Sequence, residues 1–230
     1  MLQAEVSVAI VVPVLNEQRE LPEFIRRLSA LKADELILVD GGSTDGSRAL
    51  LAESGLRWIA SDAGRAIQMN AGSIHCNSNI LLFIHVDTVI DSSHVSAVRK
   101  AMADAGCVGG RFDVRLAGRH PALSVIGWFM NMRSRLTRIS TGDQCIFVRR
   151  SLFETLGGFP ELPLMEDIAF SALLRRAGRI SCLKQRAITS GRRWELHGVI
   201  KTVLLMWKIR LLYWLGTPAD ELVLMYRHVR

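Results

Sequence analysis

The stretch LLFIHVDT, residues 81–88, decides the fold of this chain. Its first four side chains are apolar, which is typical of a strand that is buried on both faces of a sheet. Asp87 follows where that strand should end, and His85 stands two positions before it. Ligands of open parallel sheets bind in the crevice beyond the carboxyl ends of the strands. Two roles are therefore open for Asp87: it binds a divalent cation that also holds phosphates, or it caps the next helix.

Buried runs of the same kind recur on both sides of this stretch. Strands are predicted at residues 6–13, 35–40, 56–60 and 107–114, with apolar residues at helical spacing between them. This alternation predicts an α/β fold, in which helices cover both faces of a mostly parallel sheet. Ser43 or Thr44 is expected to cap a helix at residues 45–54.

The pattern is looser in the second half of the chain. There we expect an apolar helix at 121–136, a strand at 144–148, a short helix at 151–156, a helix from the Glu166-Asp167 pair to about residue 178, two short strands, and apolar helices from residue 199 onward. These elements extend the same sheet and add a helical end to it.

Composition indicates a folded protein of a reducing compartment. Hydrophobic residues make up 49% of the 230 residues, so a sizeable core is available. The four cysteines lie more than thirty residues apart in apolar stretches, which is typical of buried free thiols. We therefore expect a cytoplasmic protein.

Positive charge is concentrated near the C-terminal end. The formal net charge is +7, and residues 171–230 contain twelve Lys and Arg against three acids. This balance indicates phosphate-bearing ligands or an anionic membrane surface. Nucleic acid is not expected as a partner, because the sequence has neither an aromatic-basic stacking motif nor a recognisable reading helix.

Polar and acidic residues follow the predicted strands and begin one of the helices. They are Asn16 and Glu17, Asp40, Asp87, and the pair Glu166-Asp167. Four such positions at one edge are more than helix capping needs. Asp40 is well placed to hydrogen-bond a base or ribose, and the following Gly41 and Gly42 leave room for a ligand. The dinucleotide fingerprint and the phosphate-binding lysine motif are both absent.

The segments IVVPVLNE, LVDGGSTDGS, GRAIQMNAG, FIHVDT, GGRFDV and GGFPELPLMEDIAF occur in this order. The ordered set resembles the family-two glycosyltransferases, which have the Rossmann-like GT-A fold, and in particular a small bacterial subgroup of short, glycosyltransferase-like proteins. The resemblance covers about residues 6–190. It implies a catalytic, nucleotide-sugar-binding domain at 1–190 and a C-terminal helical extension at 191–230, within one structural unit.

The resemblance also implies a reaction and its residues. The donor would be a nucleotide-diphosphate sugar, the cofactor manganese or magnesium, and the sugar carbon would be inverted. Asp87 matches the last acid of the family's D-x-D signature and would bind the metal. Asp167, beside Glu166, matches the acid of the E-D signature and would be the base. By position, Arg65 would lie beside the base or phosphates, and the nucleoside would be held by Pro13, Asn16, Glu17, Asp40 and Gly42.

Two histidines are further metal candidates. His85 stands where the first Asp of D-x-D usually does, so it contacts the donor or metal, or it orients Asp87. Imidazole suits manganese better than magnesium, which prefers oxygen ligands. In the motif SGRRWELHG, His197 is either a further metal ligand or structural. Arg192 and Arg193 in the same motif would neutralise a departing diphosphate, or form a solvated basic turn.

Two other functions remain open. A nucleotidyltransferase also uses a metal on an open parallel sheet, but it would need a basic, glycine-rich loop after the first strand, where this chain has VPVLNE. A non-catalytic module that binds a nucleotide sugar or a lipid phosphate would differ from an enzyme only in turnover.

The predicted helix at 199–215 has thirteen apolar or aromatic side chains, interrupted by Lys201, Lys208 and Arg210. It packs on the sheet domain or on the partner in a homodimer, or it lies in the membrane interface with Trp207 and Trp214 at headgroup level. The membrane location would suit a lipid-linked acceptor and would place the protein peripherally on the inner face of the membrane.

Overall fold

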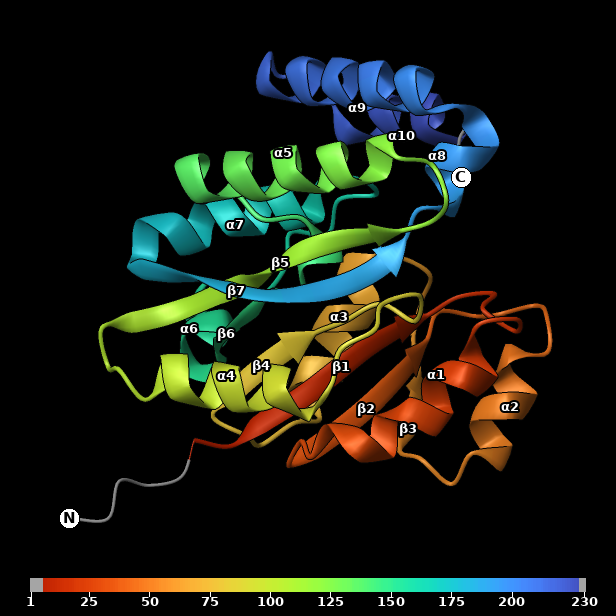
Figure 1. Ribbon diagram of the computed structural model, residues 1–230. Coiled ribbons are helices and arrows are strands. Elements are labelled where there is room, and N and C mark those ends of the chain that lie inside the picture. Colours follow the sequence, from red (N-terminus) through yellow and green to blue (C-terminus); the bar gives the residue numbers. More distant parts are fainter. Residues whose placement is uncertain (1–5, 228–230) are drawn as a thin grey trace.

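The computed structural model describes residues 6–227, apart from the side chains of Arg193 and Arg227. Within this range a 7-stranded sheet has the order β3-β2-β1-β4-β6-β5-β7. The strands are β1 (Val8–Val14), β2 (Glu35–Asp40), β3 (Trp58–Ala60), β4 (Ile80–Phe83), β5 (Cys107–Ala117), β6 (Phe147–Arg149) and β7 (Arg179–Ser190). Figure 1 shows the sheet as a twisted layer through the middle of the molecule.

The sheet is mostly parallel, as predicted. Of the described strands, β6 alone runs against its neighbours, β4 and β5. The prediction of two short strands after residue 178 is wrong, because β7 is one strand of 12 residues. The register with β5 shifts between Phe112 and Asp113, so that the polar residues Lys184 and Gln185 form an irregularity inside β7. That polar interruption is what made the sequence resemble two strands.

Helices lie on both faces of this layer, which confirms the predicted α/β architecture (Figure 1). They are α1 (Leu21–Leu28), α2 (Ser47–Glu53), α3 (Arg65–Ile74), α4 (Ser92–Met102), α5 (Ala122–Thr137), α6 (Arg150–Thr155), α7 (Glu166–Ala177), α8 (Arg192–His197), α9 (Val199–Trp214) and α10 (Ala219–Arg227). Short 3-10 turns occur at η1 (Ser29–Leu31) and η2 (Gly142–Gln144).

Strand β1 shows why the sheet needs helices on both sides. Its alternate residues Val8, Ile10 and Val12 belong to one hydrophobic cluster, with residues of α1 and α4. Ala9 and Val11 belong to a second cluster, with residues of α3, α6 and α7. Because successive side chains of a strand point to opposite faces, an all-apolar strand is stable only between two apolar layers.

Two helix starts differ from the expected capping. Helix α4 is capped by Asp91, whose Oδ1 accepts a hydrogen bond from the N–H of Ser93 at 2.8 Å, so Asp87 is not its cap. Helix α2 begins only at Ser47 and has no side-chain cap, so the predicted cap at Ser43 or Thr44 is wrong. The hydroxyl of Ser43 instead accepts a hydrogen bond from the loop that follows β1.

The C-terminal helices α9 and α10 lie together at the end of the molecule that is uppermost in Figure 1, above α5. Ile209 of α9 and Leu222 and Tyr226 of α10 form a hydrophobic cluster with Met165, which directly precedes α7. One side of α9 is therefore packed. Within residues 6–227, no helix is long and apolar enough to cross a membrane.

Candidate active site

One edge of the sheet gathers the loops that carry the predicted site residues. The carboxyl ends of the parallel strands lie at this edge, and so does the beginning of the antiparallel strand β6. The edge borders a cleft with a volume of about 2170 Å³. Small-molecule sites typically measure ~300–1,000 Å³, so the cleft has room for more than one substrate.

The cleft brings together most of the residues predicted from the sequence. Its walls include Pro13, Asn16, Glu17, Arg65, His85, Asp87, Glu166, Arg192 and His197. Asp40, Gly42 and Asp167 are described by the structure but are not wall residues. The side chain of Arg193 lies outside the described part of the chain, so its role toward a diphosphate stays a prediction.

Hydrogen bonds fasten the loop after β1 to the loop after β2. Asn16 Oδ1 accepts from the N–H of Thr44 at 2.8 Å, and the N–H of Asn16 donates to Ser43 Oγ at 2.9 Å. Asn16 has a φ of 55°, a left-handed conformation in which asparagine is enriched. The N–H of Glu17 donates to Ser47 Oγ at 2.8 Å. These bonds fix the backbone that carries the Glu17 carboxyl group.

Asp40, which was predicted to contact the nucleoside, is fully buried at the end of β2. Its carboxylate accepts hydrogen bonds from the N–H groups of Gly42 and Ser43, each at 3.2 Å. Gly42 has a φ of 84°, in the left-handed region that favours glycine. Asp40 therefore shapes the turn at the end of β2, and its contact with a nucleoside stays a prediction.

Gln68 of α3 ties the same two strand ends together. Its Nε2 donates to the carbonyl oxygens of Val14 and Val39, both at 2.8 Å, in the buried layer between helix and sheet. Arg65 is the first residue of this helix, about one turn before Gln68. The buried amide thus holds the Arg65 backbone at the edge of the cleft.

Negative charge is crowded at the ends of β1 and β4. The pKa of Glu17 is raised from 4.5 to about 7, mainly by burial and in addition by the charges of Asp87 and Glu20. Arg65 and Arg192 act in the opposite direction. A carboxyl group with these neighbours keeps its proton longer than usual, because a second negative charge is unfavourable there.

This crowding fits a divalent cation that is shared with a substrate. No group of three or more His, Cys, Asp or Glu side chains among the described residues is arranged to hold a metal ion by itself. Mg²⁺ sites commonly use one or two carboxylates and complete their coordination with substrate phosphates and water. The Asp87 carboxylate beside Glu17 fits such an open site, whereas metal ligation by His85 and His197 stays a prediction.

The η2 turn separates His85 from Asp167. A Cβ atom at Gly142 would lie 2.5 Å from Cε1 of His85. The His85 imidazole can therefore occupy this position only because residue 142 is a glycine. The N–H of Gly142 donates to Asp167 Oδ2 at 2.8 Å. Next to it, Asp143 Oδ1 lies 4.0 Å from Nδ1 of His85. The η2 turn therefore sets the position of His85, which follows β4, relative to that of Asp167 on α7.

The two acids that begin α7 have different surroundings. Glu166 is buried in the cleft wall. Burial acts to lower the pKa of Arg65, but the negative charges around it, Glu166 foremost, raise that pKa. Asp167 is half-buried, and its Oδ1 accepts from the N–H of Ile168 at 2.7 Å. Burial raises the pKa of Asp167, although two backbone donors and Arg210 act against this shift.

The segment after β7 closes one side of the cleft. Arg192, at the start of α8, forms an ion pair with Glu20, with Nη1 2.7 Å from Oε1. A donor diphosphate that binds Arg192 would have to compete with this carboxylate. His197 ends the same helix and also lines the cleft.

Several charged wall residues were not predicted as site residues, and Asp143, Arg133 and Arg210 are among them. Asp143 comes before β6, whereas the prediction considered mainly residues that follow strands. Arg133 and Arg210 lie on α5 and α9, where each interrupts an apolar helix. An arginine among apolar residues of a helix was the available signal, because such a side chain needs an aqueous or anionic neighbour.

The raised pKa of Glu17 predicts a pH-dependent stability. The folded state holds the Glu17 proton more tightly than the unfolded state, so Glu17 makes folding less favourable as pH rises from 4.5 to about 7. In the absence of divalent cations, Glu17→Gln should therefore raise the melting temperature relative to wild type at pH 8 more than at pH 4.5. Thermal unfolding at both pH values measures this. Glu53→Gln, on the exposed part of α2, is the control for removal of one carboxylate. An equal change for Glu17→Gln at both pH values would contradict the assignment.

The fold is shared with solved enzymes. Glucosyl-3-phosphoglycerate synthase from Mycobacterium tuberculosis, solved in complex with Mn²⁺, uridine diphosphate and glucosyl-3-phosphoglycerate, has a TM-score of 0.65 at 21% identity, over 94% of this chain and 82% of the other. TarS of S. aureus, solved with UDP-GlcNAc, has a TM-score of 0.64 at 18% identity, over 80% of this chain and 58% of the other. These similarities confirm the predicted fold.

The sequence is similar to part of a group of bacterial transferases. The undecaprenyl-phosphate 4-deoxy-4-formamido-L-arabinose transferase of Pseudomonas fluorescens (strain SBW25) is 37% identical over 93 residues, which are 35% of this chain and 27% of that protein. The transferase of the same name from Salmonella paratyphi A is 31% identical over 94 residues, or 29% of its length. The matched part is thus less than a third of each relative.

The family model for glycosyl transferase family 2 matches residues 9–157, and this match confirms the resemblance predicted from the sequence motifs. It includes the loops that carry Asn16, Asp40 and Asp87. Because the match spans well over half of the 230 residues, the chain belongs to glycosyl transferase family 2.

Proposed function

We propose that this family-two glycosyltransferase moves a sugar from a nucleotide-diphosphate sugar to an acceptor hydroxyl, with metal dependence and inversion at the sugar carbon. One observation carries the proposal. A single cleft contains two acidic groups with unlike surroundings: Asp87 with Glu17 beside the loop after β1, and Glu166 in the wall at the start of α7, next to Asp167. Such a pair suits a reaction that needs both a cation site and a base.

The donor is assigned to the side of the cleft formed by the loops after β1, β2 and β4. Asn16 and Glu17 would hold the nucleoside there, together with Pro13, Asp40 and Gly42. Solved relatives are bound to UDP-GlcNAc and to uridine diphosphate, which makes UDP sugars the first donors to test. Arg65 and Arg192 would face the diphosphate, since guanidinium groups match phosphate oxygens.

The leaving group is assigned to the same side. When the bond between the sugar carbon and the diphosphate breaks, the electron pair stays on the diphosphate oxygen. Asp87, assisted by His85, would hold the divalent cation, which when bound supplies a Lewis acid for that developing charge. Arg65 and Arg192 add positive charge at the same place. Because these side chains belong to the protein, that charge is in position before the bond breaks.

The base is assigned to Asp167. The acceptor oxygen bonds to the sugar carbon on the face opposite the diphosphate, and its proton passes to the Asp167 carboxylate. The raised pKa of Asp167, caused first by burial, makes the carboxylate a better proton acceptor. The N–H groups of Gly142 and Ile168 fix its orientation. Glu166 is the competing carboxylate, because it lines the cleft directly.

The acceptor is proposed to come from a membrane. Helices α5 and α9 border the cleft through Phe129 and Trp207 among others, and they expose further apolar side chains, namely Trp128 on α5 and Leu211 and Trp214 on α9. Lys201 and Lys208 are exposed on the same helix. An apolar surface with nearby lysines suits an anionic lipid interface. Named relatives act on undecaprenyl phosphate, which also supports a lipid-linked acceptor and a place on the inner face of the membrane. The alternative is that a second copy of the chain packs on this surface in a homodimer.

The metal assignment predicts the behaviour of Asp87→Ala. The variant should stay folded and lose the manganese-dependent part of UDP binding, because the carboxylate that shares the cation with the phosphates is gone. Titration of UDP with and without Mn²⁺ measures this. Asp62→Ala removes an exposed aspartate that is not a wall residue and is the matched control. Unchanged manganese dependence in Asp87→Ala would overturn the metal assignment.

The base assignment predicts different results for two neighbouring carboxylates. Asp167→Asn should keep donor binding and reduce sugar transfer by a factor on the order of a hundred or more, as is typical for the loss of a positioned base. Glu166→Gln should affect transfer less. Product formation with any active acceptor, or donor hydrolysis, gives the rate. If Glu166→Gln loses the activity and Asp167→Asn keeps it, the base is Glu166.

The membrane assignment predicts binding to anionic vesicles. The protein should float with phosphatidylglycerol vesicles at low salt and less at high salt, and the triple variant Ile200→Glu, Leu211→Glu, Trp214→Glu should not float. All three side chains are exposed, so the fold should tolerate the changes. Ile74→Glu, which replaces an 80% exposed side chain at the end of α3, is the matched control. Wild-type protein that stays with the unbound fraction at low salt would contradict the assignment.

A further inference from the structure

Two arginines from different helices line the cleft and interact electrostatically with Asp167. Arg133 comes from α5 and Arg210 from α9, and Figure 1 shows α9 above α5. The Nη2 atom of Arg133 is shielded from solvent and has no hydrogen-bond partner among the described residues. A buried donor on a charged group without a partner is costly, so the site favours an added acceptor.

The nearby acids oppose the positive charge of these two arginines, but burial lowers the pKa of both. The pKa of Arg133 is lowered to about 10, mainly by burial and in addition by the positive charges of Arg210 and Arg111, whereas Asp167 opposes the shift. Burial also lowers the pKa of Arg210, with Asp167 and Asp143 acting against it. The two guanidinium groups thus repel each other while both are partly withdrawn from water.

The third arginine nearby differs in having its own partners. Arg111 is fully buried, forms an ion pair with Asp113, and donates to the carbonyl oxygens of Phe112 at 3.1 Å and Asn131 at 3.2 Å. Its role is to join β5 to α5. Arg133 has no comparable carboxylate partner among the described ion pairs. Because Arg111 Nε is also buried without a hydrogen-bond partner, it is the missing carboxylate partner that marks Arg133 as a group available to an anion.

The charges around this pair distinguish it from Arg192. Arg192 acts on Glu17, which also feels the charge of Asp87, whereas Arg65 acts both on Glu17 and on the group formed by Glu166, Asp143 and Asp167. Arg133 and Arg210 act on Asp167, the proposed base. An anion between Arg133 and Arg210 would therefore sit beside the group that takes the acceptor's proton, so it would belong to the acceptor.

We propose that Arg133 and Arg210 form a phosphate-binding subsite for the acceptor, which carries a phosphate group in addition to the hydroxyl that receives the sugar. The assignment of this phosphate to the acceptor rests on the proposed function, because it uses the role of Asp167. Paired guanidinium groups match the oxygens of a phosphate and can bind it through two parallel hydrogen bonds each.

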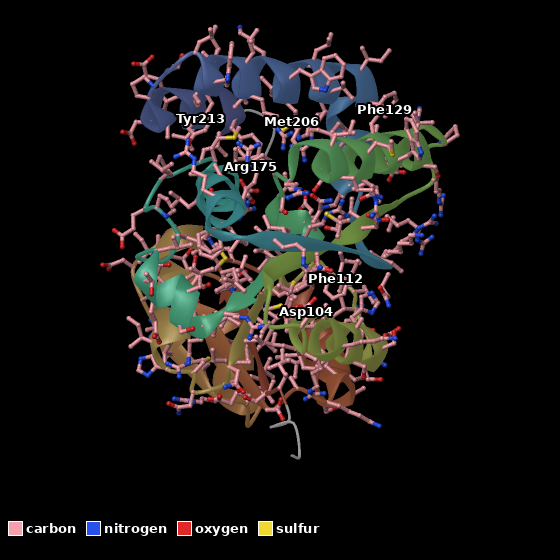
Figure 2. All side chains as sticks on the ribbon, turned by 90° about the vertical axis from the view of Figure 1, so that its left-hand side faces the viewer. Asp104, Phe112, Phe129, Arg175, Met206 and Tyr213 are labelled. Carbon is pink, nitrogen blue, oxygen red and sulfur yellow. The ribbon has the colours of Figure 1, made fainter. Side chains whose placement is uncertain are left out.

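The apolar wall near the subsite is compatible with either a soluble or a lipid phosphate. Figure 2 shows Met206 on the side of α9 that faces α5, and Phe129 on the side of α5 that faces α9. Both residues line the cleft. A lipid chain could lie along this wall while its phosphate contacts the arginines, and a soluble phosphate ester would leave the wall uncovered.

The first experiment uses inorganic phosphate as the probe. Its affinity is measured from the phosphate-dependent rise in melting temperature, with the donor side filled by UDP and Mn²⁺ and again without nucleotide. The double variant Arg133→Gln, Arg210→Gln should bind phosphate at least tenfold more weakly and keep the wild-type affinity for UDP. Arg176→Gln, on an exposed part of α7, should bind phosphate as wild type does.

The outcomes separate this inference from the proposed function. Equal phosphate affinity in the wild type and the double variant overturns the subsite. Loss of UDP affinity in the double variant also overturns it, because the arginines would then belong to the donor diphosphate. If the wild type does not bind UDP, the choice of a UDP sugar as donor fails, and the measurement without nucleotide still decides the subsite. Should the double variant not fold, Arg133→Lys and Arg210→Lys keep the charge but remove the planar fork, and at least one of them must weaken phosphate binding for the subsite to stand.

A second experiment identifies the source of the phosphate. Flotation compares vesicles that contain phosphatidic acid with vesicles that contain phosphatidylglycerol at equal charge. A preference for phosphatidic acid that the arginine variants lose indicates a lipid acceptor. Phosphate binding by the wild type without that preference indicates a soluble phosphate ester. Absence of both effects overturns the proposal.

Discussion

The antiparallel pairing of β6 between β4 and β5 is the constraint on which the cleft depends. Because β6 runs against its neighbours, its beginning meets the ends of the other strands. The η2 turn, which precedes β6, is thereby placed between His85 after β4 and Asp167 on α7. A parallel strand at this position would have put the turn at the opposite edge of the sheet. The direction of one short strand therefore decides which acidic residues share a cleft.

The loops of the donor side are held by a different set of interactions. Gln68 joins carbonyl groups near the ends of two strands, and Asn16 joins the loops that follow them. Both use a side-chain amide to replace hydrogen bonds that the sheet cannot supply at its edge. Such bonds are local and directional, so they give the edge a fixed shape before any ligand arrives.

Charge is distributed unevenly across the cleft. Glu17 and Asp87 concentrate negative charge on one side, where Arg65 and Arg192 compensate only in part. Arg133 and Arg210 concentrate positive charge near Asp167. Buried like charges raise the free energy of the empty site and are relieved by ligands of the opposite sign. The two halves would thus favour different ligands, a cation with phosphates on one side and an anionic acceptor on the other.

The sequence by itself determined the fold class, the mostly parallel sheet and the family, and it predicted many of the residues that line the cleft. These follow from local patterns: unbroken apolar runs, and polar residues directly after them, as at Asp87. Only the tertiary structure shows that Asp143, Arg133 and Arg210 line the cleft. Asp143 precedes a strand, and its place depends on the direction of that strand. Arg133 and Arg210 are far apart in sequence and share one wall only because α5 and α9 border the same cleft. Long-range packing of this kind leaves no periodic signal in the sequence, because neither helix specifies its neighbour.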